Sequence, residues 1–385
     1  MTKIFVLANT ILFQRAVSGG DTVFPQMSKY FRLKHEVHVI GHIKTQPVWK
    51  MLNADAVFHT YSDIMFTNSE RKMFGPIKYI FRTIQATIFL LKLLPRQKQD
   101  VYLYSSSDLF VDTFPACVAR FLFPHVRWIA RIYHVNPLPL KRKGPLLFSL
   151  FSFFAQQLGF FFIRLNADKI LVLRGAEISH SNFNKKRIEL VDIGVGKITM
   201  PIKAIYKSYD AIWIGSLVVP RGMYDVLQIW KRVIKDIHTV RLAIVGGGSK
   251  DMIDQYKKAI IEQKLSKSID FYGYYPNKKD LYSLIKSSKL YLCLRHEGGW
   301  DIPSLEAFTY AVPVVAYTSR FFGEVLKKGF VGIEKFHYTT FAKAIVDLLN
   351  NDSMRNGLSR KATDEAKRFS WEKIAIQFEK TLQSI

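Results

Sequence analysis

The segment Arg295–Phe308 holds acidic, basic and glycine residues in an order that suits the binding of a polar ligand. It begins where the apolar run Leu290–Leu294 ends, and such a run predicts a buried strand. In an open α/β sheet, ligands bind beyond the carboxyl ends of the strands. Gly298 and Gly299 let the backbone approach a ligand closely, and Pro303 favours the start of a helix. We therefore expect a ligand-binding loop in this segment.

Two carboxylates of the segment are candidate contacts to ligand hydroxyl groups. Glu297 lies in the predicted loop and Glu306 in the predicted helix, whose N-terminus can also accommodate an anion. Carboxylate oxygens accept hydrogen bonds, so this pair suits the hydroxyls of a sugar. The alternative is a pair of solvated acids, but Glu306 falls in the largely apolar stretch Leu305–Val315, where a charged group needs a partner.

Together these residues resemble the E-x7-E motif of retaining glycosyltransferases of family four. Glu306-Ala307 and the later Ala311-Val312-Pro313-Val314 match that pattern, with Ala311 in place of the usual glycine. Eight residues separate Glu297 from Glu306, one more than in the family, and Asp301 stands where glycine is common. The resemblance implies an α/β protein of the GT-B fold, in which two Rossmann-like, doubly wound domains face each other across a cleft. It also implies that Glu297 contacts the transferred sugar and Glu306 the nucleotide ribose.

The run Trp213–Gly222 resembles the phosphate loop of the same family, in which two cations hold the donor diphosphate. Gly215 matches the glycine of that loop, and Arg221 takes the place of its lysine. A guanidinium can bind a phosphate through two parallel hydrogen bonds. Ser216 replaces the usual arginine, so the second cation is missing or comes from elsewhere in the chain. The alternative is that Arg221 is a surface arginine in a turn.

Residues after two further predicted strands extend the match. Gly246 follows the run Arg241–Val245, and the family places a glycine loop of this kind under the nucleotide. Tyr274 follows the run Ile269–Tyr272, in the segment that holds the base. The donor-binding residues that the resemblance implies are Gly19, Gly20, Gly215, Arg221, Gly246, Tyr274, Gly298, Gly299 and Glu306.

The N-terminal half matches the family more loosely. Gly19 and Gly20 follow the first predicted strand and resemble a glycine loop that faces the donor phosphates and the acceptor. His134 follows the run Trp128–Tyr133, where the family often has a histidine that lines the sugar site. The resemblance thus assigns His134 to the catalytic centre with Glu297, as a group that positions the donor sugar. The alternative is an ordinary histidine at a strand end.

The resemblance also bears on the chemistry. Retaining transfer on this fold has no agreed protein nucleophile, and front-side attack with help from the leaving phosphate fits best. No DxD pair precedes a predicted donor site. We expect cations of the protein to stabilise the leaving diphosphate, with no metal and no cofactor, and a nucleotide-diphosphate sugar as co-substrate.

Short apolar runs alternate with helix-length segments along the chain, which predicts parallel sheets covered on both faces. We expect an N-terminal acceptor-side domain, 1–203, and a nucleotide-sugar-binding domain, 204–367, with the C-terminal helix 368–385 able to pack back on the first. In that helix, Glu372 and Glu379 are expected on the exposed side. The predicted strands are Ile4–Ala8, Glu36–Ile40, Ala56–His59, Val101–Tyr104, Trp128–Tyr133, Lys169–Leu173, Ala211–Ile214, Arg241–Val245, Ile269–Tyr272, Leu290–Leu294 and Val312–Ala316.

Composition excludes several classes of protein. The 385 residues are 49% hydrophobic, which is incompatible with a disordered chain. Two cysteines far apart in sequence exclude a disulfide scaffold or a zinc module. The net charge of +25 predicts an anionic partner, such as a nucleotide, a nucleic acid or an acidic lipid. No nucleic-acid-binding module is recognisable, so we expect no nucleic-acid partner. A basic nucleic-acid-binding protein, a sugar-nucleotide epimerase and a non-catalytic GT-B-like protein remain as alternatives.

Basic and apolar residues coincide in the N-terminal half. In the segment Pro76–Leu94, helical spacing places four polar residues on one stripe, with isoleucine, leucine and phenylalanine elsewhere. Such segments are typical of membrane-surface binders, and the alternative is a helix packed on its sheet with a solvated stripe. The residues of the stripe are Lys78, Arg82, Gln85 and Lys92.

Lys141–Lys143 precede a second apolar segment, the phenylalanine-rich run Phe148–Phe162. The uncharged stretch Gly144–Ile163 contains serine and glutamine residues and lies between predicted strands, so we expect it to pack rather than to span a membrane. Met1 leads almost directly into a short strand, so we expect no secretory signal. We expect a peripheral enzyme on the cytoplasmic face of the cell membrane that binds an anionic lipid surface and acts on a lipid-linked or membrane-proximal glycan.

Overall fold

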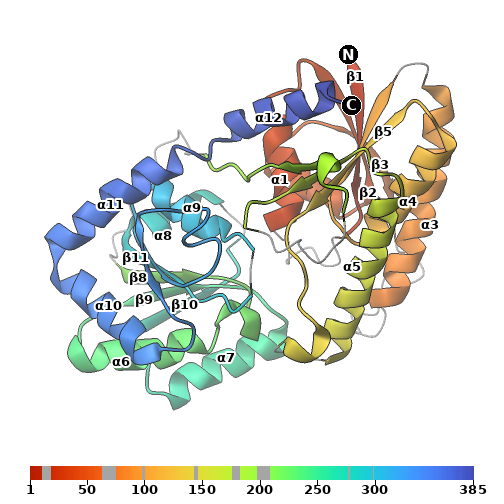
Figure 1. Cartoon of the computed structure of the whole chain (residues 1–385). Coiled ribbons are helices and arrows are strands. Elements are labelled where there is room, and N and C mark those ends of the chain that lie inside the picture. The colour runs from red at the N-terminus through yellow and green to blue at the C-terminus, as the bar shows by residue number, and fades with distance from the viewer. Residues whose placement is uncertain are drawn as a thin grey trace. The chain divides into compact units, whose positions relative to one another are not determined.

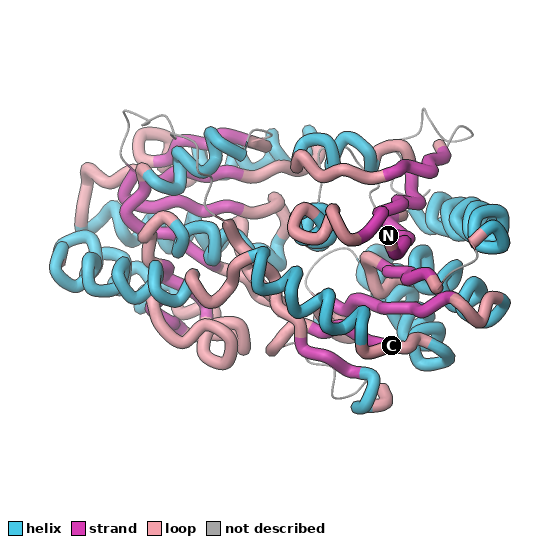
Figure 2. The backbone as a smooth tube through the Cα atoms, turned by 90° about the horizontal axis from the view of Figure 1, so that it is seen from above, coloured by secondary structure: helices cyan, strands magenta, loops and turns pink. Residues whose placement is uncertain are grey.

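The computed structural model describes residues 1–10, 19–62, 75–97, 100–142, 146–175, 183–196, 209–275, 278–297 and 299–385. The chain forms two compact units, one of residues Met1–Gly194 with Trp371–Ile385 and one of residues Val195–Ser370. The colours of Figure 1 follow the chain through both units, and Figure 2 separates their strands from their helices. The domain boundary that the sequence predicts, between residues 203 and 204, lies outside the described residues.

The first unit is built on a parallel sheet of seven strands in the order β3-β2-β1-β4-β5-β6-β7. Strand order reverses between β1 and β4, as in a doubly wound fold. The central strands read as buried β-branched and aromatic runs, which is expected of a sheet covered on both faces. The strands are β1 (Thr2–Ala8), β2 (His35–His42), β3 (Val57–Tyr61), β4 (Val101–Ser105), β5 (Val126–Ile132), β6 (Lys169–Val172) and β7 (Ile188–Leu190).

Helices cover both faces of this sheet. On one face α1 (Gly19–Ser28) packs against α2 (Thr45–Met51) and against the C-terminal helix α12 (Trp371–Gln383). On the other face α4 (Phe110–Leu122) lies between α3 (Gly75–Leu93) and α5 (Leu146–Asn166), as Figure 1 shows. All three of these helices connect consecutive parallel strands, so they run in the same direction.

The helix α5 is the uncharged stretch of the sequence, and its length and composition would suffice to cross a membrane. One side of α5 is nevertheless buried in the first unit. A Cβ at Gly159 would lie 1.9 Å from the carbonyl oxygen of Asp108, so only glycine permits this close approach. Gln156, Phe160 and Ile163 are buried on the same side. The helix therefore packs on the sheet, as the sequence predicts.

The basic stripe expected on α3 is wrong at Arg82. This side chain is fully buried, and its Nη1 donates to the backbone oxygen of Asn9 at 2.8 Å. Helical spacing alone cannot predict that residue 82 faces the end of β1. There the backbone carbonyl of Asn9 needs a hydrogen-bond donor. The solvent side of α3 is instead occupied by apolar residues.

The second unit contains a parallel sheet of six strands in the order β10-β9-β8-β11-β12-β13. Its order reverses between β8 and β11. Two short edge strands, β7 in the first sheet and β13 in the second, were not predicted. The strands are β8 (Tyr209–Ile214), β9 (Leu242–Val245), β10 (Ile269–Gly273), β11 (Ser288–Cys293), β12 (Val314–Tyr317) and β13 (Phe330–Ile333).

One continuous core holds the second unit together. Trp213 of β8 and Trp230 of α6 are almost fully buried within it. The apolar face of α6 packs on α10, which also contacts β12 and β13. The helices are α6 (Asp225–Asp236), α7 (Lys250–Glu262), α8 (Lys278–Lys286), α9 (Ile302–Thr309), α10 (Tyr338–Asn350) and α11 (Asp352–Ala366).

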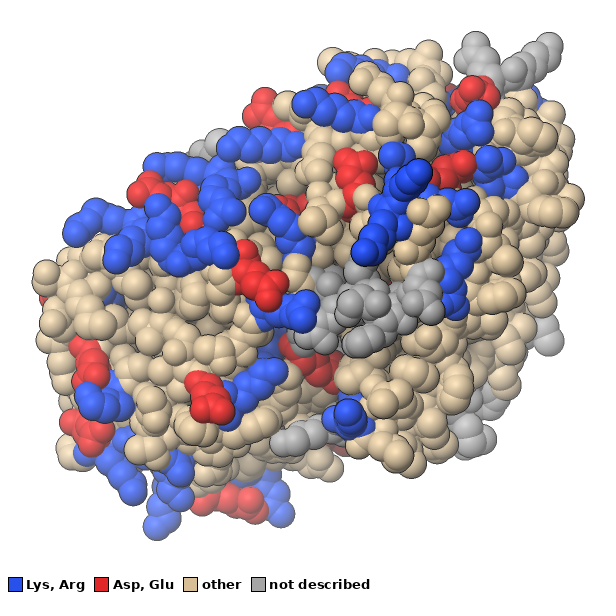
Figure 3. Space-filling model, in the orientation of Figure 1, with Lys and Arg blue, Asp and Glu red and all other residues tan. Residues whose placement is uncertain are grey.

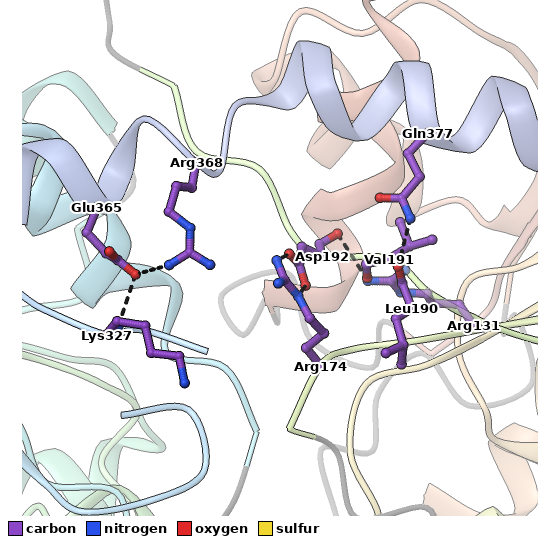
Figure 4. A network of polar contacts seen from close by, with 9 residues as sticks. All are labelled: Arg131, Arg174, Leu190, Val191, Asp192, Lys327, Glu365, Arg368 and Gln377. Carbon is purple, nitrogen blue, oxygen red and sulfur yellow. Dashed lines mark hydrogen bonds and ion pairs between the residues drawn. The ribbon is translucent and has the colours of Figure 1, made fainter. Parts of the chain in front are cut away.

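Polar contacts fix the segments near the unit boundaries, each within its own unit (Figure 4). In the first unit, Gln377 of α12 donates to the backbone oxygen of Leu190 at 2.7 Å. In the second, Glu365 accepts from the backbone nitrogen of Lys327 at 3.0 Å and also pairs with Arg368. Glu379, expected on the exposed side of α12, is largely buried instead, with 17% of its side chain exposed. It pairs with Lys34 at 2.9 Å and lies 3.9 Å from His35, so this side of α12 faces the first unit.

Candidate functional site

The carboxyl ends of β8 and β11 meet at the point where the strand order of the second sheet reverses. Ligands of doubly wound sheets bind at such a switch point, because the two flanking loops diverge there. The loop after β8 carries Arg221, and the loop after β11 carries Arg295 and Glu297. The backbone nitrogen of His296 donates to the oxygen of Pro220 at 2.9 Å, so the two loops are hydrogen-bonded.

Arg221 ends a short 3₁₀ turn, Val219–Arg221, and the residue after it fixes where the loop runs. Gly222 has a left-handed φ of 77°, and a Cβ there would lie 2.3 Å from the backbone oxygen of Leu294. Only glycine fits both constraints. The loop can therefore pass directly over the end of β11, and Arg221 is half-buried beside it.

Arg295 lies close enough to Arg221 to affect it electrostatically. The positive charge of Arg295 and, second, burial lower the pKa of Arg221 to about 10. Arg221 remains protonated at neutral pH, but two neighbouring cations repel each other unless an anion lies near both. Arg295 is itself held by the backbone oxygen of Trp300 at 2.7 Å and by Asp301 at 3.9 Å. The sequence left the second cation of this loop unassigned, and the structure places Arg295 next to Arg221.

Glu306 lies in α9 and is largely buried. Its Oε1 accepts hydrogen bonds from the hydroxyl of Tyr282 at 2.8 Å and from Nζ of Lys278 at 3.1 Å. Burial and the charge of Glu306 raise the pKa of Tyr282, which keeps this hydroxyl a donor. Both bonds end on Oε1, so among the described residues Oε2 is left as the acceptor for a ligand hydroxyl.

Asp301, which stands where the family commonly has glycine, has a structural role. It is the N-cap of α9, and its side chain accepts from the backbone nitrogen of Ser304 at 3.1 Å and from the Ser304 hydroxyl at 2.6 Å. The hydroxyl of Tyr291 donates to the same carboxylate at 3.0 Å. These bonds fix the start of the helix that carries Glu306.

The other residues of the second unit that the sequence predicts as donor contacts lie along the same edge of the sheet. Glu297 is half-buried in the loop after β11, near Gly299, whose φ is 100°. Gly298 lies outside the described residues. A Cβ at Gly246 would lie 2.1 Å from the oxygen of Gly215, so the loops after β8 and β9 touch through glycine backbones.

Tyr274 borders the same group of loops. Gly247, next to Gly246, faces its side chain, since a Cβ at Gly247 would lie 3.2 Å from the Cβ of Tyr274. The Tyr274 side chain is exposed beyond the end of β10. The edge therefore combines glycine backbones with one exposed aromatic ring, which suits a flat base above a phosphate-binding turn.

Sequence reasoning missed one pair of residues that braces this edge. Nε2 of His296 lies 2.8 Å from Oδ2 of Asp225, the first residue of α6, and the hydroxyl of Tyr317 donates to the same oxygen at 2.9 Å. Nζ of Lys335 donates to the backbone oxygen of His296 at 2.8 Å. Asp225 and His296 are far apart in sequence, so only the adjacency of β8 and β11 could have revealed them.

The candidate residues of the first unit lie at the carboxyl edge of its own sheet. Gly19 and Gly20 begin α1, and the hydroxyl of Tyr133 donates to the oxygen of Gly20 at 3.2 Å. His134 follows β5, and Nε2 of Gln156 donates to its backbone oxygen at 2.8 Å. The structure therefore brings the glycines and His134 to one edge, with Gln156 of α5 holding the histidine loop.

A buried polar network supports this edge. Oδ1 of Asp112 accepts from the backbone nitrogen of Asn9 at 3.0 Å and from its side chain at 2.9 Å. Oδ2 accepts from the hydroxyl of Ser107 at 2.6 Å. Burial raises the pKa of Asp112 to about 7 and that of Asp108 likewise to about 7. The network closes the end of β1 against α4.

Within the described ranges, no three His, Cys, Asp or Glu side chains are grouped so that they could hold a metal ion. Arg221 and Arg295 are neighbouring cations at the switch point of the second sheet.

Two doubly wound parallel sheets in one chain define an α/β protein of the GT-B fold, and solved structures share it. The Anabaena protein HepE, determined in complex with UDP and glucose, matches with a TM-score of 0.73 at 12% identity, covering 100% of both chains. Sucrose-phosphate synthase from Thermosynechococcus elongatus matches with a TM-score of 0.78 at 12% identity, covering 100% of this chain and 99% of that one. The predicted fold class is thus confirmed.

The second unit carries the family signature. Residues 200–365 match the family model described as Glycosyl transferases group 1. A poly(glycerol-phosphate) alpha-glucosyltransferase from Bacillus subtilis is 25% identical over 43% of this chain and 24% of its own length. A phosphatidyl-myo-inositol mannosyltransferase from Mycobacterium leprae is 26% identical over 45% of this chain and 46% of its own length. The matches thus span less than half the length of these two relatives.

Proposed function

We propose that this chain is a retaining glycosyltransferase that moves a sugar from a nucleotide-diphosphate donor to a lipid-linked or membrane-proximal glycan. The observation that carries the proposal is the group at the switch point of the second sheet. There Arg221 and Arg295 form a pair of neighbouring cations, and Glu306 keeps one carboxylate oxygen for a ligand. Two cations beside a hydroxyl acceptor suit a diphosphate joined to a ribose.

The chemistry follows from what these residues can bind. Arg221 and Arg295 would neutralise the charge that develops on the leaving diphosphate, and a site with fixed cations needs no reorganisation when that charge appears. Glu306 would hold the ribose through Oε2. Glu297 would contact the transferred sugar, and His134 would position it. The leaving phosphate itself would help to deprotonate the acceptor hydroxyl on the same face of the sugar, so no protein base is assigned.

The relatives support the substrate classes. The HepE structures contain UDP, UDP-glucose or UDP with glucose, which makes UDP-sugars the first donors to test. The names of two curated relatives give a poly(glycerol phosphate) and a phosphatidyl-inositol as the molecules that they glycosylate. Both are anionic, and the net charge of +25 suits acceptors of that kind.

We also propose a place and a metal requirement. The enzyme would work as a peripheral protein on the cytoplasmic face of a membrane, since a lipid-linked acceptor is accessible there. It would use no metal, because Arg221 and Arg295 supply the positive charge.

A panel of nucleotide sugars tests the proposal by thermal shift and by release of the free nucleotide diphosphate. A ligand at about 100 times its Kd stabilises the protein by about 2.7 kcal/mol. Glu306→Ala should abolish this shift and detectable transfer while the fold is retained, because a lost hydrogen bond to a charged group costs roughly 2–5 kcal/mol. The control is Glu334→Ala, which removes a carboxylate that is 76% exposed in the same unit. If no nucleotide sugar shifts the wild type, or if Glu306→Ala behaves like the control, the proposal is wrong.

A further inference from the structure

The helix α3 is apolar on both of its sides. Tyr79, Ala86 and Leu90 are buried against the first sheet. A second row of residues, spaced three or four apart, faces away from the sheet and is exposed by 38–55%. A helix that is apolar all round is normally covered on all sides. The exposed row consists of Ile77, Ile80, Ile84, Ile88 and Leu91.

The neighbouring helices continue this surface. Phe121 at the end of α4 is 81% exposed. Exposed apolar residues on α5 again recur at helical spacings, here of three, four or seven positions, with Phe154 at 62%. Since α4 packs between α3 and α5, the three helices present one apolar face, and in Figure 3 the side where α5 lies is largely tan. The exposed residues of α5 are Leu147, Phe154, Leu158, Phe161 and Leu165.

The exposed charges on these three helices are of one sign. Their sequences contain a single acidic residue, Asp112, and it is fully buried. Lys92 and Arg96 are exposed at the end of α3, and Arg164 is exposed near the end of α5. Lys141 is exposed just before α5. The apolar face therefore has cations at its ends and, on its own helices, no exposed carboxylate.

The apolar face and the cations at its ends together indicate which kind of partner this surface binds. A second copy of the chain, docked through the same face, would bring its cations toward these cations, because a twofold interface pairs the same surface with itself. An anionic bilayer instead offers acyl chains to the apolar side chains and negative headgroups to the cations. The charge pattern therefore favours a membrane over a second copy.

The apolar face is also continuous in sequence with the candidate site of the first unit. The loop that begins with His134 runs through Leu140, which is 89% exposed, and Lys141 before it enters α5. If the exposed side of α5 contacts a bilayer, an acceptor held in that bilayer would thus lie beside the loop that carries His134.

We propose that the outer face of α3, α4 and α5 is the membrane-binding surface of this protein, with its isoleucine, leucine and phenylalanine side chains inserted among the acyl chains of an anionic bilayer. The inference rests on the proposed action at a membrane and names the surface responsible. It replaces the basic stripe expected on α3 by an apolar surface whose cations lie at the ends of the helices.

Vesicle flotation of the full chain tests this surface without donor or acceptor. The face variant combines Ile84→Asp with Phe154→Asp, and the matched control combines Ile261→Asp with Ile376→Asp, which are 66% and 49% exposed on α7 and α12. With vesicles that contain phosphatidylglycerol, the face variant should partition about tenfold more weakly than the wild type, and the control about equally. High salt should weaken wild-type binding without abolishing it, since the apolar part is not screened.

Insertion is measured with the variant Phe154→Trp and vesicles whose acyl chains carry bromine. The fluorescence that this tryptophan adds to that of the wild type should be quenched by the bromine atoms. Equal partitioning of face variant and control, absent wild-type binding, or an unquenched tryptophan would overturn the proposal. So would a dimer in light scattering that only the face variant dissociates, since a second copy would then cover the face. Release of nucleotide diphosphate in vesicle-free solution is scored separately. A face variant that keeps this release and loses vesicle binding separates this surface from the donor site.

Discussion

His296 and Asp225 are joined by a hydrogen bond of 2.8 Å between Nε2 and Oδ2, so the loop after β11 is fixed to the first turn of α6. The backbone oxygen of the same histidine accepts a hydrogen bond from Nζ of Lys335, and its backbone nitrogen donates one to the oxygen of Pro220. The loops that carry Arg221 and Glu297 therefore have one common support. His296 is a positioning residue, since it acts through these loops.

We expect His296→Leu to weaken donor binding and to lower the free energy of unfolding. The substitution leaves the buried carboxylate of Asp225 with one donor fewer, and a hydrogen bond to a charged group contributes about 1.5–3 kcal/mol. His296→Gln can place an amide nitrogen near Asp225 and should recover most of the donor affinity. Calorimetric titration with the nucleotide diphosphate measures this difference. Equal affinity in wild type and His296→Leu would show that the support is not needed for binding.

The sequence predicted the fold well because buried parallel strands have a strong local pattern. Apolar runs such as Leu290–Leu294 recur at the positions of the observed strands. The two strands it missed are short and lie at sheet edges. Strand β7 has Glu189 at its centre, and β13 contains Gly332, so neither shows an uninterrupted apolar run.

The candidate site was predicted in part because its residues come from separate loops. Glu306 and Arg221 could be named from local motifs. Arg295 could not be named as the second cation, because its proximity to Arg221 follows from the pairing of β8 with β11. Arg82 was misplaced for the same reason, since its partner Asn9 follows a strand that is distant in sequence.

The pair of cations leads to a second prediction. Arg221→Ala should abolish detectable transfer, and Arg295→Ala should reduce kcat/KM by roughly 10²–10³, because each removes positive charge from a leaving diphosphate. Removing Arg295 should also raise the pKa of Arg221, whose lowering is caused first by the charge of Arg295. Steady-state kinetics of the two variants measure the loss. The control is Arg360→Ala on α11, an exposed arginine in the same unit.

A third prediction concerns metal ions. If Arg221 and Arg295 supply the charge, transfer should persist in excess EDTA at more than about half of the untreated rate. The measurement is the initial rate after extensive dialysis against chelator, with magnesium and manganese added back. A rate that collapses and is restored by either ion would show that a cation holds the diphosphate. Glu306→Ala, assayed under both conditions, gives the background.

Ala311, which stands where the sequence pattern it resembles usually has glycine, offers a direct test of that departure. Its φ is 61°, a left-handed conformation that side chains rarely adopt, and it follows Tyr310, the C-cap of α9, at the position where helices commonly end with glycine. The backbone nitrogen of Ala311 donates to the oxygen of Phe308 at 3.1 Å, and that of Val312 to the oxygen of Ala307 at 3.0 Å. These bonds hold Ala311 in the strained conformation.

Ala311→Gly should therefore stabilise the second unit, by about 1 kcal/mol, because the strain of the left-handed Cβ is removed. The gain is reduced by the larger freedom of glycine in the unfolded chain. Urea denaturation of the full chain measures the change, and Ala259→Gly in the middle of α7 is the control, expected to lose about 0.5–1 kcal/mol. An Ala311→Gly protein no more stable than the wild type would show that the conformation carries no strain.

The buried carboxylate of Asp112 makes the last prediction, on pH. Burial raises its pKa from the ordinary 3.8 to about 7, so between these values the native protein holds a proton that the unfolded chain has lost. Stability falls with pH wherever the native state binds more protons. The stabilising contribution of Asp112 is thus complete below about pH 4 and is lost as the pH rises toward 7.

Asp112→Asn cannot ionise but keeps an oxygen for Asn9 and a polar group for Ser107. It should therefore be less stable than the wild type near pH 5, and this deficit should shrink by pH 8. Denaturation midpoints of both proteins across this range give the difference, and other titrating groups cancel in it. The exposed Asp55→Asn, whose side chain is 83% accessible, should show no such convergence. A deficit that stays constant with pH would mean that Asp112 is already ionised in the folded protein at pH 5.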